Sequence, residues 1–201
     1  MNIFINKYIG GATLDSIEVA VQKVKNGEPE PFGVIIDEFQ QKLFHYCCHM
    51  LGSVHDAEEA VQEVFFKAYK NIGSYKKTVS FSAWLYKIAY NQCINIIRRK
   101  KLVQFIPFID GIGYYESKGE KGVDDNLLGD ELWNALKKLS PVERNIIILR
   151  TVKELSYEEI STIINIKAST IRKKYERAKK KLQESIKLTQ GGIFNERISK
   201  C

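Results

Sequence analysis

The sequence predicts an all-α protein with two small helical domains joined by a flexible linker, the second domain carrying a helix-turn-helix. Apolar residues recur every three to four positions through most of both halves of the chain, which is the spacing of one helix face. No segment alternates apolar and polar residues beside a hairpin turn, as a half-buried strand would. Between Val103 and Leu128 the helical period fails and four glycines occur, so we assign this stretch to the linker. The expected boundaries are residues 14–102, 103–128 and 129–188, followed by a tail at 189–201.

The first half is punctuated by clear helix stop and start signals. Gly27 ends the first helical segment, and the pair Gly52-Ser53 ends the second. Asp56 is expected to cap the third segment, with Glu59 three residues later completing a pair that resembles a capping box. A polar loop at 73–80 precedes the fourth segment. The four expected helices are Leu14–Asn26, Phe32–Leu51, Asp56–Ile72 and Phe81–Lys101.

The second half carries stronger signals. Ser140 is followed by a proline at the first helical position and a glutamate at the third, a favourable helix start. Ser156 and Glu159 repeat the capping box before a short helix at Tyr157–Ile164. Asn165 tolerates the left-handed conformation that a tight turn needs. A long helix from about Ser169 to Leu188 follows, so the pair is predicted to be a helix-turn-helix.

The composition is typical of a folded protein that does not enter a membrane. Of the 201 residues, 44% are hydrophobic and 27% are charged, unlike a disordered chain. No apolar run reaches the roughly 20 residues that span a bilayer, and the first ten residues lack the apolar stretch of a signal peptide. We therefore expect a cytoplasmic protein without membrane insertion. Four cysteines without metal or disulfide spacing are expected to be reduced: Cys47, Cys48, Cys93 and Cys201.

Positive charge is concentrated in the second helix of the predicted helix-turn-helix. Residues 167–187 contain nine basic and two acidic side chains, so this segment carries +7, which equals the formal net charge of the whole chain. Such a concentration indicates a polyanionic partner. The first turns of the second helix touch base edges in the major groove of DNA, and Arg and Glu can read guanine and cytosine there. The side chains available for this are Thr170, Arg172, Lys173, Glu176 and Arg177.

The first half carries weaker functional signals. A second basic cluster, Arg98 to Lys101, closes the helix that begins at Phe81, and aromatic residues lie before it. Aromatic residues beside basic ones suit single-stranded nucleic acid. The same aromatic residues also suit a hydrophobic core, which is the favoured interpretation for Trp84 and some of the tyrosines. Acidic residues from Asp56 onwards fit the dipole of a helix N-terminus, but this explanation weakens by Glu63, nearly two turns into the helix.

Two groups of motifs together resemble the extracytoplasmic function sigma factors of bacterial RNA polymerase. The segments from Asp56 to Phe65 and from Trp84 to Asn91, followed by Arg98-Arg99, resemble the second domain of that family. The segments beginning at Leu139, Leu155 and Ser169 resemble its fourth domain. The resemblance covers about residues 15–188, with both groups in the family's order. It implies a protein that binds the polymerase core, recognises the −35 promoter element as duplex and the −10 element as melted strand, and directs transcription initiation.

The resemblance also implies roles for individual residues. The helix from Asp56 would dock on the clamp coiled coil of the largest polymerase subunit, and an anti-sigma factor is an expected further partner. Arg150 joins the residues of the fourth domain that would meet the −35 element. The family usually has Gly at the turn position held by Asn165, and the reading positions held by Lys173 and Glu176 vary within it. The implied contacts are Glu59, Gln62 and Glu63 for the polymerase; Tyr75, Asn91, Arg98 and Arg99 for the −10 element; and Arg150, Thr170, Arg172, Lys173, Glu176 and Arg177 for the −35 element.

Parts of the sequence also fit other functions. A helix-turn-helix regulator that acts without being a polymerase subunit would explain the second half, but not the combination of Gln62-Glu63, Tyr75 and Asn91 in the first. Metal binding by His45, Cys48 and His49 is a third interpretation, because His45 and His49 share a helix face, but no fourth ligand is evident and buried thiols are favoured. No phosphate-binding loop or catalytic nucleophile motif occurs, so we expect neither an enzyme nor a cofactor.

Overall fold

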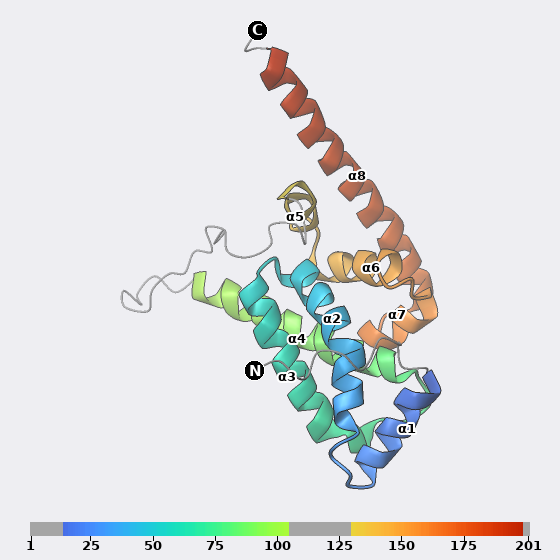
Figure 1. Cartoon of the computed structure of the whole chain (residues 1–201). Coiled ribbons are helices and arrows are strands. Elements are labelled where there is room, and N and C mark those ends of the chain that lie inside the picture. Colours follow the sequence, from blue (N-terminus) through green and yellow to red (C-terminus); the bar gives the residue numbers. More distant parts are fainter. Residues whose placement is uncertain (1–13, 105–129, 199–201) are drawn as a thin grey trace.

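The computed structural model describes residues 14–104 and 130–198, all of whose regular elements are helical (Figure 1). The N-terminal bundle comprises α1 (Leu14–Lys25), α2 (Phe32–Leu51), α3 (Val54–Asn71), a short 3₁₀ turn (Ile72–Ser74) and α4 (Phe81–Gln104). The C-terminal bundle comprises α5 (Asp130–Leu136), α6 (Pro141–Thr151), α7 (Tyr157–Ile164) and α8 (Ala168–Ile198). Most of the predicted linker lies outside the described residues. No helix of the described part is long and apolar enough to cross a membrane.

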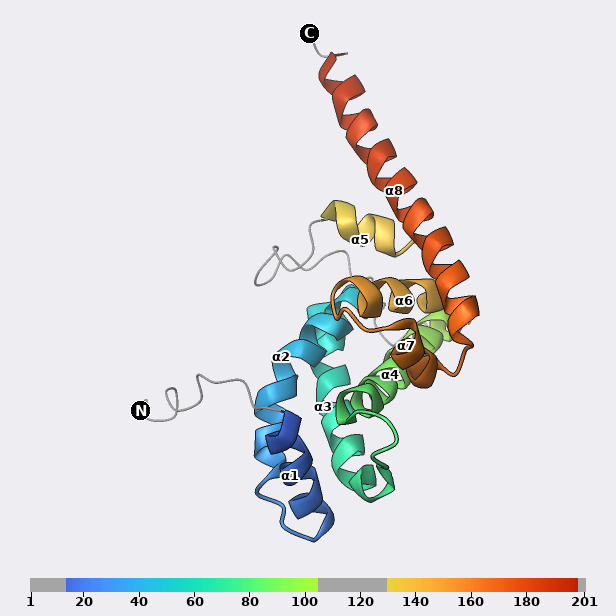
Figure 2. The ribbon, with the colours of Figure 1, turned by 90° about the vertical axis from the view of Figure 1, so that its right-hand side faces the viewer.

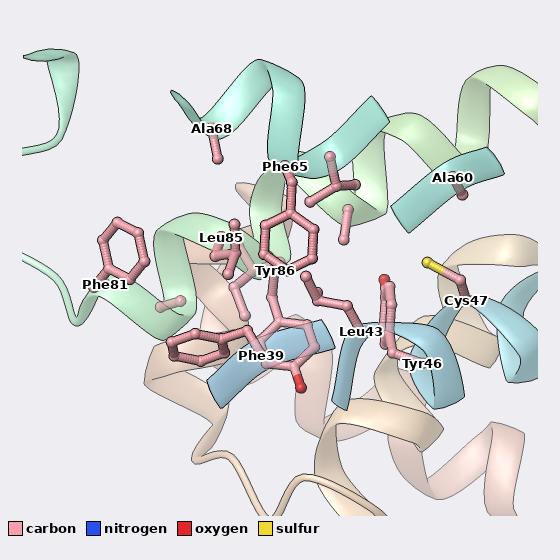
Figure 3. Packing of buried hydrophobic residues seen from close by; sticks show 14 of the residues in the cluster. Phe39, Leu43, Tyr46, Cys47, Ala60, Phe65, Ala68, Phe81, Leu85 and Tyr86 are labelled. Atoms are coloured by element: carbon pink, nitrogen blue, oxygen red, sulfur yellow. The ribbon is translucent and has the colours of Figure 1, made fainter. Parts of the chain in front are cut away.

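The N-terminal bundle is organised around α2, which packs against α1, α3 and α4. Side chains from α2, α3 and α4 meet in its core, as Figure 3 shows. Phe39 of α2 stacks edge-on against Phe81 of α4, with ring centroids 6.0 Å apart, and Tyr46 does the same with Tyr86 at 5.2 Å. These contacts fix the position of α4, the helix that carries most of the predicted −10 residues.

The C-terminal bundle contains the predicted helix-turn-helix. Both capping boxes are present, at Ser140 with Glu143 and at Ser156 with Glu159, and Asn165 adopts a left-handed conformation with φ of 54°. The buried side chains Ile163 and Ile171 belong to the cluster that holds α7 and α8 together. Helix α8 continues beyond this body and projects from it (Figures 1 and 2). The capping boxes and the left-handed Asn165 show that local sequence signals determine the helix-turn-helix.

Three local predictions need correction. Ser53, not Asp56, caps α3: its hydroxyl accepts a hydrogen bond from the backbone N–H of Asp56, because serine is an equally good cap three positions earlier. Helix α5 was not predicted. Helix α8 runs to Ile198 rather than ending near Leu188, because no proline follows and glycine costs a helix only about 1 kcal/mol, against about 3 kcal/mol for proline.

The two bundles pack against each other. Helix α7 lies on α4, and α6 contacts α2, as the two views of the ribbon also show (Figures 1 and 2). A single cluster of buried apolar residues extends from α1 through α4 into α6, α7 and the start of α8. The hydrophobic pattern of the sequence predicted two bundles but not this shared interface.

Candidate nucleic-acid interface

The first turns of α8 present the predicted −35 residues to solvent. The helix begins at Ala168, and Ile171 and Ala178 are fully buried on its inner face. This anchoring turns the opposite face outward. All five predicted side chains on this helix are exposed: Thr170, Arg172, Lys173, Glu176 and Arg177.

Tyr157, the first residue of α7, organises two of the predicted arginines. The Arg172 guanidinium lies 5.3 Å from the centroid of the Tyr157 ring, and the Arg150 guanidinium lies 5.1 Å from it. Arg150 also donates a hydrogen bond of 3.0 Å to the backbone carbonyl of Leu155, which ties α6 to the loop before α7. Tyr175 of α8 packs edge-on against the same ring. Sequence reasoning missed Tyr157, although its place at the start of the first helix of the motif marks it as a neighbour of the recognition helix.

One lysine of the basic helix serves the fold. Lys181 donates a 2.7 Å hydrogen bond to the carboxylate of Glu143 at the start of α6. Burial alone would raise the pKa of Glu143, but the hydrogen bonds from Lys181 and Ser140 lower it to about 2. Lys181 is exposed but engaged with α6, whereas the exposed Lys180 lies 4.0 Å from Glu184 on its own helix.

Asn91 lies on the exposed face of α4 in a hollow between α3 and α4, which we call the α3–α4 groove. Lys67 of α3 donates a 2.7 Å hydrogen bond to the Gln92 side chain across this groove. The amide and ammonium groups of such a groove can hydrogen-bond to base edges, and its aromatic ring can stack on a base. The groove is lined by Lys67, Asn71, Ser74, Trp84, Lys87, Ile88, Asn91, Gln92 and Asn95.

Two of the other predicted −10 residues are accessible and one is not. Arg98 and Arg99 are exposed near the end of α4. The Tyr75 side chain is only 1% exposed, and its ring packs against Phe81 and Trp84 with centroids 5.3 and 5.7 Å away. The Tyr75 hydroxyl lies 2.8 Å from the Glu18 carboxylate, and burial together with this hydrogen bond raises the pKa of Tyr75. In this structure the Tyr75 ring is part of the core and offers no free face for a base.

The exposed face of α3 carries the three predicted polymerase contacts. Glu59 and Glu63 have side chains 60% and 40% exposed, and Gln62 is exposed between them. Phe66 follows one turn later and is 53% exposed, with the Lys70 ammonium 4.3 Å from its ring centroid. Sequence reasoning missed Phe66, although its position three residues after Glu63 indicates the same helix face.

Comparisons with known proteins assign the family. Residues 35–103 match the Sigma-70 region 2 family, and residues 129–182 match the Sigma-70, region 4 family. The ECF RNA polymerase sigma factor SigW of Bacillus subtilis is 34% identical over 181 residues, which are 85% of this chain and 97% of that protein. The chain belongs to the ECF sigma factor family. The ECF sigma-E factor of Escherichia coli K12 is 29% identical over 179 residues, covering 84% of this chain and 93% of its own.

Two solved structures share this fold. The sigma factor RpoE of Bartonella quintana, solved with the anti-sigma factor NepR, matches with a TM-score of 0.62 and 26% identity over 78% of this chain and 96% of its own. CnrH, solved with the cytosolic domain of CnrY, matches with a TM-score of 0.65 and 17% identity over 87% of this chain and 99% of its own, which shows a common fold.

Family membership confirms the predicted class of function. The protein is an alternative sigma factor that directs transcription initiation, with RNA polymerase and promoter DNA as partners, and no comparison supports a regulator that acts apart from the polymerase. Sigma factors as a class are initiation factors rather than enzymes.

The metal hypothesis finds no support in the sigma factor's described residues, where no three His, Cys, Asp or Glu side chains gather as ligands would. The ring of His49 lies in hydrogen-bond contact, through Nδ1, with the backbone carbonyl of His45. Cys48 is buried, and burial raises the pKa of its thiol to about 12.

Proposed function

We propose that this sigma factor divides promoter recognition and polymerase binding among three helices. The exposed face of α3 at Glu59, Gln62 and Glu63 docks on the clamp coiled coil of the polymerase core. Both carboxylates pair at the surface with a side chain of the same helix, Glu59 with His55 at 3.5 Å and Glu63 with Lys67 at 3.1 Å, and such exposed ion pairs contribute little. They remain available to basic side chains of a partner.

Helix α4 takes the −10 element as melted single strand. Asn91 in the α3–α4 groove accepts or donates hydrogen bonds to an unstacked base, and Arg98 and Arg99 meet the adjacent phosphates. Tyr75 contributes indirectly, because its buried ring packs against Trp84, which lines the groove. Capture of flipped bases offsets the few kcal/mol that unstacking each base costs.

Helix α8 takes the −35 element as duplex. Thr170, Arg172, Lys173, Glu176 and Arg177 lie in the first turns of this helix, where a recognition helix meets base edges. Arg150 contributes through its contact with Tyr157, near the same end of the helix. The observation that carries the proposal is this row of exposed side chains in the basic segment 167–187, whose net charge of +7 equals that of the whole chain.

The protein acts by binding alone, without a catalytic step or a cofactor, and it works in the cytoplasm together with the polymerase. An anti-sigma factor is a further expected partner, because the Bartonella quintana relative was solved in complex with one.

Promoter-specific transcription with purified core polymerase tests the function. We expect a specific transcript with the wild-type protein, and loss of open-complex formation with unchanged −35 duplex binding for Asn91→Ala. Gln92→Ala is a matched control, because Gln92 lines the same groove but hydrogen-bonds to Lys67. A wild-type protein that neither binds core polymerase nor yields a promoter-specific transcript would refute the proposal. Normal open-complex formation by Asn91→Ala would remove Asn91 from the site.

A further inference from the structure

Helix α1 holds Tyr75, the first residue of the segment between the 3₁₀ turn and α4, which we call the 75–80 loop. Lys25 of α1 donates a 2.8 Å hydrogen bond from Nζ to the backbone carbonyl of Tyr75, and its ammonium lies 5.8 Å from the centroid of the Tyr75 ring. At the other end of the same tyrosine, the hydroxyl lies 2.8 Å from Oε1 of Glu18. Glu18 and Lys25 are seven residues apart, which places them two turns apart on one face of α1. Two polar side chains of α1 therefore hold both ends of Tyr75.

The position of α1 is itself fixed by the core of the N-terminal bundle. The helix packs on α2 and on the 3₁₀ turn, although it lies before the residues that match Sigma-70 region 2. The Glu18 side chain lies beside the buried face of α1 and is only 21% exposed. Because packed apolar side chains keep fixed positions, Glu18 and Lys25 meet the loop from a defined place. The buried face of α1 consists of Ile17, Ala20, Val21 and Val24.

The Tyr75 hydroxyl also ties the 75–80 loop to itself. It lies 3.0 Å from the backbone carbonyl of Val79, so its single proton is shared between that carbonyl and the Glu18 carboxylate. The second carboxylate oxygen of Glu18 is buried without a hydrogen-bond partner in the described part of the chain, and the Lys77 ammonium lies 4.0 Å from it. A carboxylate in this position favours the loop conformation that supplies its donor, because another conformation would leave both oxygens unpaired.

The 75–80 loop lies beside the α3–α4 groove. Ser74 and Trp84 line both that groove and a second hollow, whose other walls include residues of the loop. The Tyr75 ring packs against Trp84 on the buried side, with the ring centroids 5.7 Å apart. The conformation of the loop and the position of Trp84 therefore shape the surface next to Asn91, and both depend on where Tyr75 is held.

We propose that Glu18 and Lys25 are positioning residues for the −10 element, which act through Tyr75 to hold the 75–80 loop in the conformation that receives the melted strand. This role rests on the function proposed above. Glu18 acts from the inner side of the loop and does not meet the strand itself. A loop that is ordered before binding raises the affinity for the strand, because side chains that become ordered only on binding lower it. Helix α1 thus belongs to the −10 interface without contacting DNA through Glu18.

The proposal predicts equal losses from the two partners of the Glu18–Tyr75 hydrogen bond. The assay is binding of the reconstituted holoenzyme, at one fixed salt concentration, to a fork template: a promoter duplex that carries the −10 element as a single strand. We expect Glu18→Ala and Tyr75→Phe each to raise the apparent Kd about three- to tenfold, the effect of losing one hydrogen bond to a charged group. The double variant should lose no more than either single variant, because both substitutions remove the same contact.

Matched variants separate positioning from a general effect of charge. Glu18→Gln keeps an oxygen that can accept from the Tyr75 hydroxyl and should bind the fork within about twofold of wild type. Glu28→Ala removes one negative charge, as Glu18→Ala does, but this residue is exposed beyond the end of α1, so fork binding should not change. Lys25→Met removes the donor to the Tyr75 carbonyl and should weaken fork binding, whereas Lys23→Met, exposed in the same turn, should not.

A merely structural role for the contact would lower every binding activity together. We therefore expect Glu18→Ala to bind core polymerase and a −35 duplex within about twofold of wild type, since those surfaces are distant and independent. Unchanged fork binding by Glu18→Ala, a matching loss of core or −35 binding, or an equal loss in Glu18→Gln would overturn the proposal. A wild-type holoenzyme that binds a fork with a scrambled −10 strand equally tightly would instead refute the proposed function, so the two failures are distinguishable.

Discussion

Replacing Tyr157 by leucine is expected to weaken −35 binding although Tyr157 is not itself a predicted DNA contact. The Arg172 and Arg150 guanidinium groups lie 5.3 and 5.1 Å from the ring centroid, within the roughly 6 Å at which a cation–π attraction operates. Each such contact contributes about 0.5–1 kcal/mol at an accessible site. Leucine keeps much of the apolar volume of Tyr157 but offers no aromatic face to either arginine.

The effect on DNA binding follows from the loss of side-chain order at Arg172. Without the ring, Arg172 must be ordered when it meets DNA, which costs about 0.5–1.5 kcal/mol for a long side chain. We therefore expect the Kd for a −35 duplex to rise about two- to tenfold. Fluorescence anisotropy of a labelled duplex at one fixed salt concentration measures this change.

Matched variants separate positioning from general loss of fold. Tyr157→Phe keeps the ring and should bind within about twofold of wild type, and circular dichroism should show equal helix content for both variants. Unchanged affinity for Tyr157→Leu, or equal losses for Phe and Leu, would refute the positioning role of the ring.

Three further outcomes follow from the same contacts. Arg177→Ala should weaken binding to the preferred −35 sequence by about 1–3 kcal/mol and reduce discrimination among sequences; equal weakening for every sequence, measured by competition with mutated duplexes, would make it a phosphate contact. Glu143→Gln should lower the free energy of unfolding by about 1–3 kcal/mol near neutral pH, as measured by urea unfolding. Because the folded-state pKa of Glu143 is about 2 and its ordinary value is 4.5, the stabilising contribution of its carboxylate is complete above pH 4.5 and is lost as the pH falls towards 2. Between pH 4.5 and pH 2 the free energy of unfolding should therefore fall less for Glu143→Gln than for the wild-type protein. Gly52→Ala should destabilise the protein by about 2–4 kcal/mol through strain at positive φ and a clash with the Trp133 ring, which lies against Gly52, whereas Gly27→Ala, at φ of 97° with open space around it, should cost about 1–2 kcal/mol; equal values for both would contradict this close approach.

The accuracy of the sequence predictions differed between local and long-range features. Helix α7 and its capping box were predicted from Ser156 and Glu159, because both groups act within one helical turn. The cap of α3 was misassigned because Ser53 and Asp56 are both good caps, and only the backbone path selects between them. The sequence left open whether Tyr75 packs in the core or meets a base, since an aromatic residue in a loop looks the same in a sequence whether it faces solvent or core.

The sequence by itself determined the helical architecture, the helix-turn-helix and the basic recognition helix, because helix periodicity, capping and charge depend on residues a few positions apart. The resemblance of its motifs also determined the family. Only the tertiary structure decided that Tyr157 gathers two arginines, that Phe66 is exposed beside the acidic face of α3, and that the two bundles close on each other. These features arise from contacts such as that between Tyr46 and Asn145, 99 residues apart, whose formation depends on how whole helices pack and leaves no periodic signal in the chain.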